Sequence, residues 1–331
     1  MKSSKRYIPY MGGKQKYAER IIKKIKELHP NAKYFYDLFG GGGSVSFYAK
    51  ESGYFEEVFY NDLDTRIVKL MEHLRVDGVT EDMRRWYSQE EYKQRINEQS
   101  HIGGLLATCY SFGNNGKNYM YNPDVERYKQ CYHNLVMFGE DTLTEMVDYC
   151  KKYVKDKYNI TQDLVLTVPT GNTYTERRLH VRKQLNMFEK NCKVSQLRNL
   201  QQLEKLEQLE QLEQLEGLQQ LQQLERLERL ERFPDHVYNL EYQNVPINTP
   251  LEETVIYCDP PYKGTSKYKQ DVDHEDFYKW VKDCKYPVFV SSYDFELSCV
   301  MGIETRSTMS STNNSTKATE KLFYKAQHEP R

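Results

Sequence analysis

Four consecutive glycines, Gly40 to Gly43, limit what this chain can fold into. They directly follow a short aromatic run, Tyr34 to Phe39, and precede a helical pattern over Ser44 to Lys50. Glycines between a buried strand and a helix let the backbone turn tightly and approach a ligand, beside the free N–H groups of the helix start. The sequence therefore predicts a ligand-binding turn here, with a glycine turn that holds no ligand as the alternative.

Alternating strand and helix patterns surround this turn. A helix is expected over Lys16 to Leu28, a second strand over Glu57 to Tyr60 and a further helix over Thr65 to Leu74. Two later runs, Thr254 to Cys258 and Pro287 to Ser291, are rich in β-formers and end in polar residues. This order predicts a Rossmann-like α/β fold with a parallel sheet whose two halves are separated by a mainly helical insertion.

The pattern divides the chain into three segments with different expected roles. Residues 1–79 and 251–331 form the two parts of the sheet domain, and 80–250 is the insertion. A last strand is expected over Lys321 to Tyr324, after a polar loop to which no role is assigned. The formal net charge of −1 excludes a wholly basic nucleic-acid coat but leaves room for local basic faces.

The same composition argues against a membrane or extracellular setting. No apolar run approaches the 18 or so residues of a membrane span. The seven cysteines are scattered and contain no CxxC pair, which argues against a disulfide framework and against a zinc site. We therefore expect a cytoplasmic protein that needs neither metal nor membrane.

A leucine repeat occupies residues 197–230, with leucine at every third position and mostly Gln, Glu, Lys and Arg between. These residues favour helix, but leucines three apart step back about 60° around an α-helix, so no straight packing face can run the whole length. A coiled coil would need a period of 3.5. We therefore expect a low-complexity helical or solenoid-like insertion with no chemistry, and its protein partner, if it has one, is not specified.

Two acidic positions follow expected strands and point to chemistry. Asp62 lies 22 residues beyond Gly40, where a carboxylate can accept hydrogen bonds from ribose hydroxyls, although Val45 replaces the third glycine of GxGxxG. Asp259-Pro260-Pro261-Tyr262 follows the run Thr254 to Cys258, at the sheet edge where ligands of open α/β sheets bind. A carboxylate, a rigid proline carbonyl and an aromatic ring together suit a planar ring that bears an amino group, with an ordinary turn as the alternative.

This combination resembles the Dam-type family of DNA adenine methyltransferases. The order agrees as well: Pro9 to Lys14 (PYMGGK), the glycine loop, an insertion, then the DPPY tetrapeptide. The resemblance covers residues 7–75 and 250–295 and, less specifically, Cys109 to Asn115, while the leucine repeat lies outside it. Tyr10 stands where many relatives have tryptophan, and either ring supplies an aromatic face.

The resemblance implies S-adenosylmethionine as methyl donor, double-stranded DNA as substrate, and a bacterial or phage restriction-modification setting. The implied donor-binding residues are Tyr10, Lys14, Asp37, Phe39, Gly40, Gly42, Asp62 and Asp259. The implied catalytic residues, which receive an adenine flipped from the duplex, are Asp259, Pro260, Pro261 and Tyr262. Asp259 and the Pro260 carbonyl would accept hydrogen bonds from the adenine amino group and make its nitrogen more nucleophilic. Asp259 is not expected to act as a full general base, because an unperturbed aspartate has a pKa near ~4.

Basic and aromatic residues of the insertion are candidates for DNA contact. The densest basic cluster is Arg177, Arg178, Arg182 and Lys183, and a solvated helix face is the alternative reading. Tyr110 and Asn114 are candidates for contact with the flipped base or the gap that it leaves, with an ordinary loop as the alternative.

Other functions share parts of this pattern. Methylation of RNA adenine, of the cytosine amino group or of a protein amide uses similar tetrapeptides. A protein of another class, a non-catalytic DNA-binding scaffold, would use the leucine repeat to recruit partners, but the intact glycine loop and DPPY weigh against it.

Overall fold

The computed structural model describes residues 7–159, 161–198, 217–261, 272–306 and 317–326. Contacts divide the chain into two compact units, which we call the sheet unit and the helical unit. The sheet unit comprises the described parts of Met1–Gly78, Arg95–Lys117 and Arg226–Arg331. The helical unit comprises those of Val79–Gln94 and Asn118–Glu225. The assignment of roles to residues 1–79, 80–250 and 251–331 stays a prediction.

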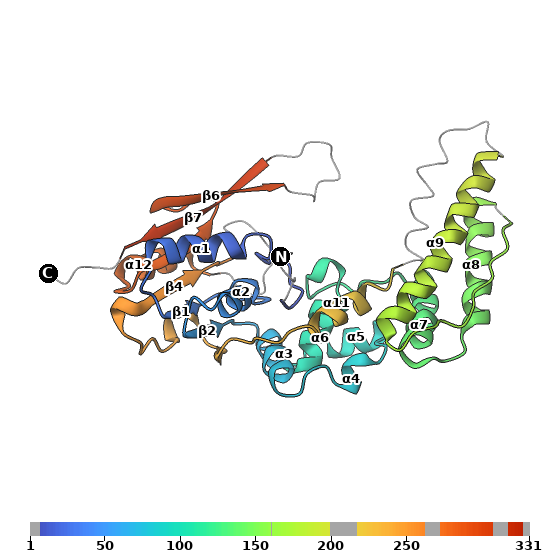
Figure 1. Cartoon of the computed structure of the whole chain (residues 1–331), viewed down its shortest axis with the longest axis horizontal. Helices are drawn as coiled ribbons and strands as arrows, with labels where there is room; N and C mark the ends of the chain where they lie inside the picture. The colour runs from blue at the N-terminus through green and yellow to red at the C-terminus, as the bar shows by residue number, and fades with distance from the viewer. Residues whose placement is uncertain (1–6, 160, 199–216, 262–271, 307–316, 327–331) are drawn as a thin grey trace. The chain divides into compact units, whose positions relative to one another are not determined.

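A seven-stranded sheet forms the centre of the sheet unit (Figure 1). In spatial order its strands are β3 (His236–Tyr238), β2 (Glu57–Asn61), β1 (Tyr34–Asp37), β4 (Thr254–Cys258), β5 (Val288–Ser292), β7 (Lys317–Lys325) and β6 (Ser298–Arg306). The pairs from β3 to β5 are parallel, and β7 pairs antiparallel with both β5 and β6. This mixed α/β sheet confirms the expected Rossmann-like architecture.

Both faces of the sheet are buried, which explains why its strands are continuously apolar. Successive residues of a strand point to opposite faces, so Phe35 packs in one core cluster and Tyr36 in the other. The first cluster includes apolar residues of α1 (Ala18–Leu28) and α2 (Ser44–Ser52), and the second includes Phe277 of α12 (His274–Asp283). The strands β1, β2, β4 and β5 lie within one or two residues of the expected bounds.

Two further helices complete the sheet unit beside the carboxyl ends of β1 and β2. Helix α3 (Thr65–Val76) begins at Asp64, whose carboxylate accepts the Arg66 N–H at 3.1 Å as an N-cap. Helix α6 (His101–Cys109) packs against α3, and Gly104 makes the close approach possible. A Cβ at Gly104 would collide with the Arg66 carbonyl oxygen.

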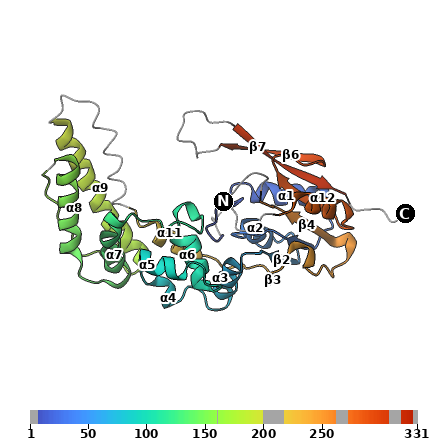
Figure 2. The ribbon, with the colours of Figure 1, turned by 180° about the vertical axis from the view of Figure 1, so that it is seen from behind.

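Helices make up the helical unit. They are α4 (Glu81–Arg84), α7 (Pro123–Phe138), α8 (Leu143–Tyr158) and α9 (Tyr174–Arg198). Helix α7 packs against α8 and α9 (Figure 2). Two of the boundaries between the units fall within helices, α5 (Gln89–Arg95) and α11 (Gln219–Leu227). The remaining elements are the short 3-10 helices η1 (Phe112–Asn114), η4 (Tyr242–Asn244) and η5 (Leu251–Glu253).

The leucine repeat is described only at its two ends, since residues 199–216 lie outside the described part. Its last five leucines are all buried: Leu218, Leu221, Leu224, Leu227 and Leu230. Helix α11 is nine residues long, so leucines three apart drift only part of the way around it and stay on its packed side. None of the described helices is long and apolar enough to cross a bilayer.

Candidate active site

The glycine turn lies between β1 and α2 and is shaped by close contacts. Gly41 and Gly43 have φ angles of 51° and 72°, a backbone region that favours glycine. A Cβ at Gly40 would collide with the Tyr60 ring, and one at Gly42 would collide with the Ile8 carbonyl oxygen. The glycines therefore allow the backbone to approach its neighbours where any side chain would block it.

Asp62 follows β2 and is clamped between this turn and the start of α3. Its Oδ2 accepts the Gly41 N–H at 2.7 Å, and its Oδ1 accepts the Asp64 N–H at 2.8 Å. Burial raises the pKa of Asp62 to about 6, although these two N–H groups favour the ionised form. The carboxylate is thus fixed in orientation and partly desolvated at the edge where β1 and β2 end.

Asp37, the last residue of β1, is almost fully buried. Ser46 donates a hydrogen bond to Asp37 Oδ2 at 2.6 Å, while Oδ1 has no hydrogen-bond partner among the described residues. Burial raises the pKa of Asp37 to about 7, the hydrogen bond from Ser46 opposes this, and the charges of Asp259 and Asp62 add to it. A buried, unsatisfied carboxylate oxygen is costly unless a donor or cation approaches it.

Lys14 joins the two separated parts of the sheet unit by ion pairs. Its Nζ lies 2.6 Å from Asp259 Oδ2 and 3.1 Å from Glu320 Oε1, and all three side chains are largely buried. Burial lowers the pKa of Lys14, but the two carboxylates more than offset it, so the pKa is raised above its ordinary value. The Lys14 N–H also donates to Ser44 Oγ at 3.0 Å, which ties it to the start of α2.

One cavity of about 500 Å³ brings these groups together within the sheet unit. All eight residues expected to bind the donor line it: Tyr10, Lys14, Asp37, Phe39, Gly40, Gly42, Asp62 and Asp259. Volumes of roughly 300–1,000 Å³ are typical of small-molecule sites. Part of the cavity wall is formed by Tyr10 and by the glycine turn, where the Tyr10 ring packs against Gly41.

The tetrapeptide after β4 is described for its first three residues. Asp259 and Pro261 line the cavity, whereas Pro260 is buried beside it and is not part of the lining. Tyr262, expected to stack on the base, lies outside the described residues. The positions of Asp259 and Pro261 agree with the expectation that this turn stands at the carboxyl edge of the sheet.

The candidates for DNA contact in the helical unit differ in their surroundings. Arg178 on α9 is 6% exposed, and its guanidinium makes two hydrogen bonds to the Glu225 carboxylate, at 2.8 and 3.0 Å. Arg177 donates to the Val136 and Met137 carbonyl oxygens near the end of α7. These two arginines hold the helical unit together in this structure, so a role in DNA contact would require breaking those bonds. Arg182 and Lys183 are exposed on α9.

The two candidates for base contact near α6 also differ in their surroundings. Tyr110 is 2% exposed and terminates α6, so its ring lies in the protein interior. Asn114 lines the cavity, has a φ angle of 56°, and donates through its side-chain amide to the Thr108 carbonyl oxygen. Of the two, Asn114 is the one placed where a ligand can reach it.

Several residues of the site were not predicted from the sequence. Glu320, Asp64 and Arg66 were not singled out, nor were the cavity-lining residues Asn115 to Lys117. The sequence Asp64-Thr65-Arg66 carries a recognisable signal, an aspartate directly before a helix. Glu320 carries none, because its contact with Lys14 depends on the position of β7 between β5 and β6. No group of three or more potential metal ligands is found among the described residues.

The sheet order, the glycine turn after β1 and the carboxylates at the carboxyl edge are consistent with a Rossmann-like methyltransferase fold. Residues 10–102 match the model of the D12 class N6 adenine-specific DNA methyltransferases. The match confirms the family and the enzyme class expected from the sequence. The matched residues include Tyr10, the glycine turn and Asp62, and they end before Asp259. Among curated proteins, no sequence matches this chain closely enough to count as a relative.

Proposed function

We propose that this protein transfers a methyl group from S-adenosylmethionine to the exocyclic amino group of adenine in duplex DNA, after base flipping. The observation that carries the proposal is the cavity in which the glycine turn, Asp62 and Asp259 meet. These three features come from segments as far apart in the sequence as residues 40 and 259. The glycine turn and Asp62 would form the donor site and Asp259 the acceptor site, and methyl transfer requires the two sites to be adjacent.

The residues of the cavity fit the donor. Gly40 and Gly42 line the cavity and allow the turn to pack directly against Tyr60 and Ile8. The Asp62 carboxylate can accept hydrogen bonds from ribose hydroxyls. The unsatisfied Oδ1 of Asp37 suits a cationic group such as an α-ammonium. When bound, S-adenosylmethionine supplies a methyl group activated by the sulfonium sulfur.

In this proposal Asp259 holds the acceptor. A carboxylate has lone pairs enough to accept hydrogen bonds from Lys14 and from an amino group at the same time. Lys14 fixes Asp259 in position, and Pro260 restricts the backbone that follows. Hydrogen bonds from the adenine amino group to Asp259 and the Pro260 carbonyl would favour a nucleophilic nitrogen at a defined distance from the methyl group, so that positioning supplies much of the acceleration.

In this proposal Arg182, Lys183 and Asn114 contact the DNA. Arg177 and Arg178 instead serve the packing of the helical unit, because their guanidinium groups are engaged with Val136, Met137 and Glu225. The insertion 80–250 remains the proposed target-recognition region, and the cytoplasm of a bacterial or phage-infected cell is the proposed setting.

Transfer of labelled methyl from S-adenosylmethionine to duplex DNA, followed by nucleoside analysis, tests this function. N6-methyladenine as the labelled product is expected. Label found in RNA, in cytosine or in a protein amide would redirect the assignment to another amino-group methyltransferase. A failure to bind S-adenosylmethionine in a calorimetric titration would contradict the enzyme and favour the DNA-binding scaffold.

Donor affinity should depend on pH through two buried carboxyl groups. The raised pKa values, about 7 for Asp37 and about 6 for Asp62, mean that both groups gain their negative charge as the pH rises through this range. An ionised Asp37 attracts the ammonium group of the donor and an ionised Asp62 is the better acceptor for ribose. We therefore expect affinity to strengthen from pH 5.5 to 8, as measured by calorimetry.

The matched variant for this prediction is Asp37→Asn, which keeps the shape of the side chain and removes its charge. Its donor affinity should be weaker at pH 8 and change less with pH than that of the wild type. Without donor, the free energy of unfolding should change with pH in the opposite direction to donor affinity. An acid whose folded-state pKa is raised favours folding most below pH 3.8, and this contribution is lost as the pH rises through 7. Affinity independent of pH in the wild type would contradict the assignment of Asp37.

A further inference from the structure

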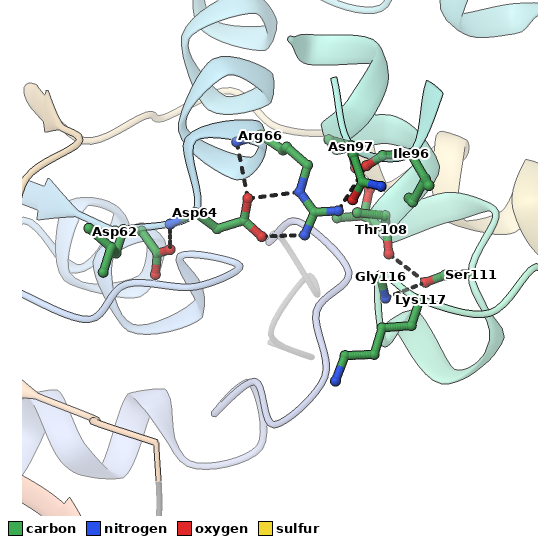
Figure 3. A network of polar contacts seen from close by, with 12 residues as sticks. Asp62, Asp64, Arg66, Ile96, Asn97, Thr108, Ser111, Gly116 and Lys117 are labelled. Atoms are coloured by element: carbon green, nitrogen blue, oxygen red, sulfur yellow. Dashed lines mark hydrogen bonds and ion pairs between the residues drawn. The ribbon is translucent and has the colours of Figure 1, made fainter. Parts of the chain in front are cut away.

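Arg66 lies at the centre of a polar network beside the cavity, and nothing in the activity so far derived uses it. Its side chain is 5% exposed. The guanidinium lies 2.9 Å from Asp64 Oδ1 and 2.6 Å from Asp64 Oδ2, and it donates to the Ile96 carbonyl oxygen at 2.9 Å (Figure 3). A paired arginine at this depth is held in a single orientation.

One end of this network reaches the donor side of the cavity. The Asp64 N–H donates to Asp62 Oδ1, and the opposite oxygen of Asp62 accepts the Gly41 N–H. Asp64 therefore touches the proposed ribose-binding acid through its backbone and Arg66 through its carboxylate. The Asp64 carboxylate also accepts the Arg66 backbone N–H, so loss of the guanidinium alone leaves Asp64 capping α3 and its N–H on Asp62.

The other end reaches the loop Ser111–Lys117. Gly116 has a φ angle of 62°, and a Cβ built there would come within 3.4 Å of Arg66 Nη2 and 3.5 Å of the Ala107 side chain. The Gly116 N–H donates to Ser111 Oγ at 3.0 Å, and Ser111 in turn donates to the Ala107 carbonyl oxygen. The loop is thus anchored to α6 and seated beside the guanidinium.

This loop presents polar groups to the same cavity. Asn114, Asn115, Gly116 and Lys117 line it, as do Asp62 and Arg66. Figure 3 shows the Lys117 side chain extending away from the Asp64–Arg66 pair. Gly116 is anchored through Ser111 and lies so close to Arg66 that an added Cβ would come within 3.4 Å of Nη2, so the guanidinium limits where this part of the loop can lie.

We propose that Arg66 is a positioning residue that fixes the loop Ser111–Lys117 relative to Asp62, so that the polar groups of the loop meet the target nucleotide beside the donor. This inference rests on the proposed function. Arg66 itself acts through Asp64 and Gly116 and does not touch the reacting atoms.

The test is the variant Arg66→Met in the full-length protein, with Lys69→Met as its matched control. Lys69 lies one turn further along α3, is exposed and forms a surface ion pair with Glu72. For Arg66→Met we expect the KM for duplex DNA to rise and kcat to fall, together by about tenfold or more, because misplacement of positioning groups is costly. The dissociation constant for S-adenosylmethionine should stay within about twofold. Lys69→Met should behave as the wild type.

Two further variants separate positioning from loss of fold. Arg66→Lys keeps a charge near Asp64 but cannot make the paired hydrogen bonds, so it should restore only part of the DNA KM. Gly116→Ala strains the loop from its other side and should reproduce the defect. The double variant Arg66→Met/Gly116→Ala should be less impaired than the product of the two single effects, since both disrupt one contact.

Hydrogen exchange provides a readout that does not need methyl transfer. The amides of residues 111–117 should exchange faster in Arg66→Met than in the wild type, while those of the glycine turn stay unchanged. Unchanged exchange in this loop, or donor affinity that falls as much as DNA affinity, would overturn the proposal. A wild-type protein without transferase activity would instead contradict the proposed function, and the exchange measurement would still decide the role of Arg66.

Discussion

Asp259→Ala should greatly lower the rate of methyl transfer while leaving the fold intact. Asp259 lines the cavity and presents the carboxylate proposed to hold the adenine amino group. Loss of one preorganised polar contact to a reacting group commonly lowers kcat by roughly 100- to 1,000-fold. Lys14 keeps Glu320 as a partner at 3.1 Å in the variant, so its charge does not become uncompensated. Single-turnover transfer of labelled methyl to duplex DNA measures the effect.

Two comparisons make this result specific. Asp259→Asn keeps an acceptor oxygen and the size of the side chain, so its rate should lie between those of the wild type and Asp259→Ala. Asp283→Ala removes an aspartate at the exposed end of α12, away from the cavity, and should leave the rate unchanged. Retention of full activity by Asp259→Ala would dispose of the proposed mechanism, even if the protein proves to be a methyltransferase.

The parts of the site that could be predicted from the sequence are those encoded locally. The strand before Gly40, the helix after it and the acid after β2 each depend on neighbours within a few residues. The turn after β4 was likewise recognisable, because an aspartate and two prolines that follow an apolar run mark the end of a strand. A parallel sheet brings the carboxyl ends of its strands to one edge, so these local signals were enough to expect one cavity.

The parts that escaped prediction depend on contacts between distant segments. Strands β3 and β6 were missed, since β3 is three residues long and the central part of β6, Val300 to Ile303, has no clear alternation. Arg178, which pairs with Glu225 in the interior, was expected to contact DNA, because charge counts do not show which arginine has an internal partner. Glu320 meets Lys14 across 306 positions of sequence, and no local pattern marks either as a member of an ion pair.

Lys14→Met should destabilise the protein strongly, because Lys14 is the charged partner of two buried carboxylates. Removing one member of a buried ion pair costs about 3–5 kcal/mol in the free energy of unfolding, since the remaining charge is left uncompensated. Here Asp259 and Glu320 would both remain, with side chains only 17% and 6% exposed. Denaturant unfolding of the wild type and the variant measures the difference.

The matched control is Lys23→Met, which removes a lysine that pairs with Glu19 on the exposed face of α1. Exposed pairs contribute about 0–1 kcal/mol, so this variant should unfold nearly as the wild type does. The raised pKa of Lys14 sets the pH dependence: its contribution is complete below the ordinary value of 10.5 and is lost only as the pH rises further. The deficit of Lys14→Met should therefore be the same at pH 7 and pH 9.

A second substitution tests the electrostatic origin of that deficit. Glu320→Gln alone leaves Lys14 paired with Asp259 at 2.6 Å and should be mild, but added to Lys14→Met it removes one of the two uncompensated charges. The double variant Lys14→Met/Glu320→Gln should therefore be more stable than Lys14→Met. If the two substitutions were simply additive, the three side chains would not act as one network, and the restraint that Lys14 places on Asp259 would have to come from packing alone.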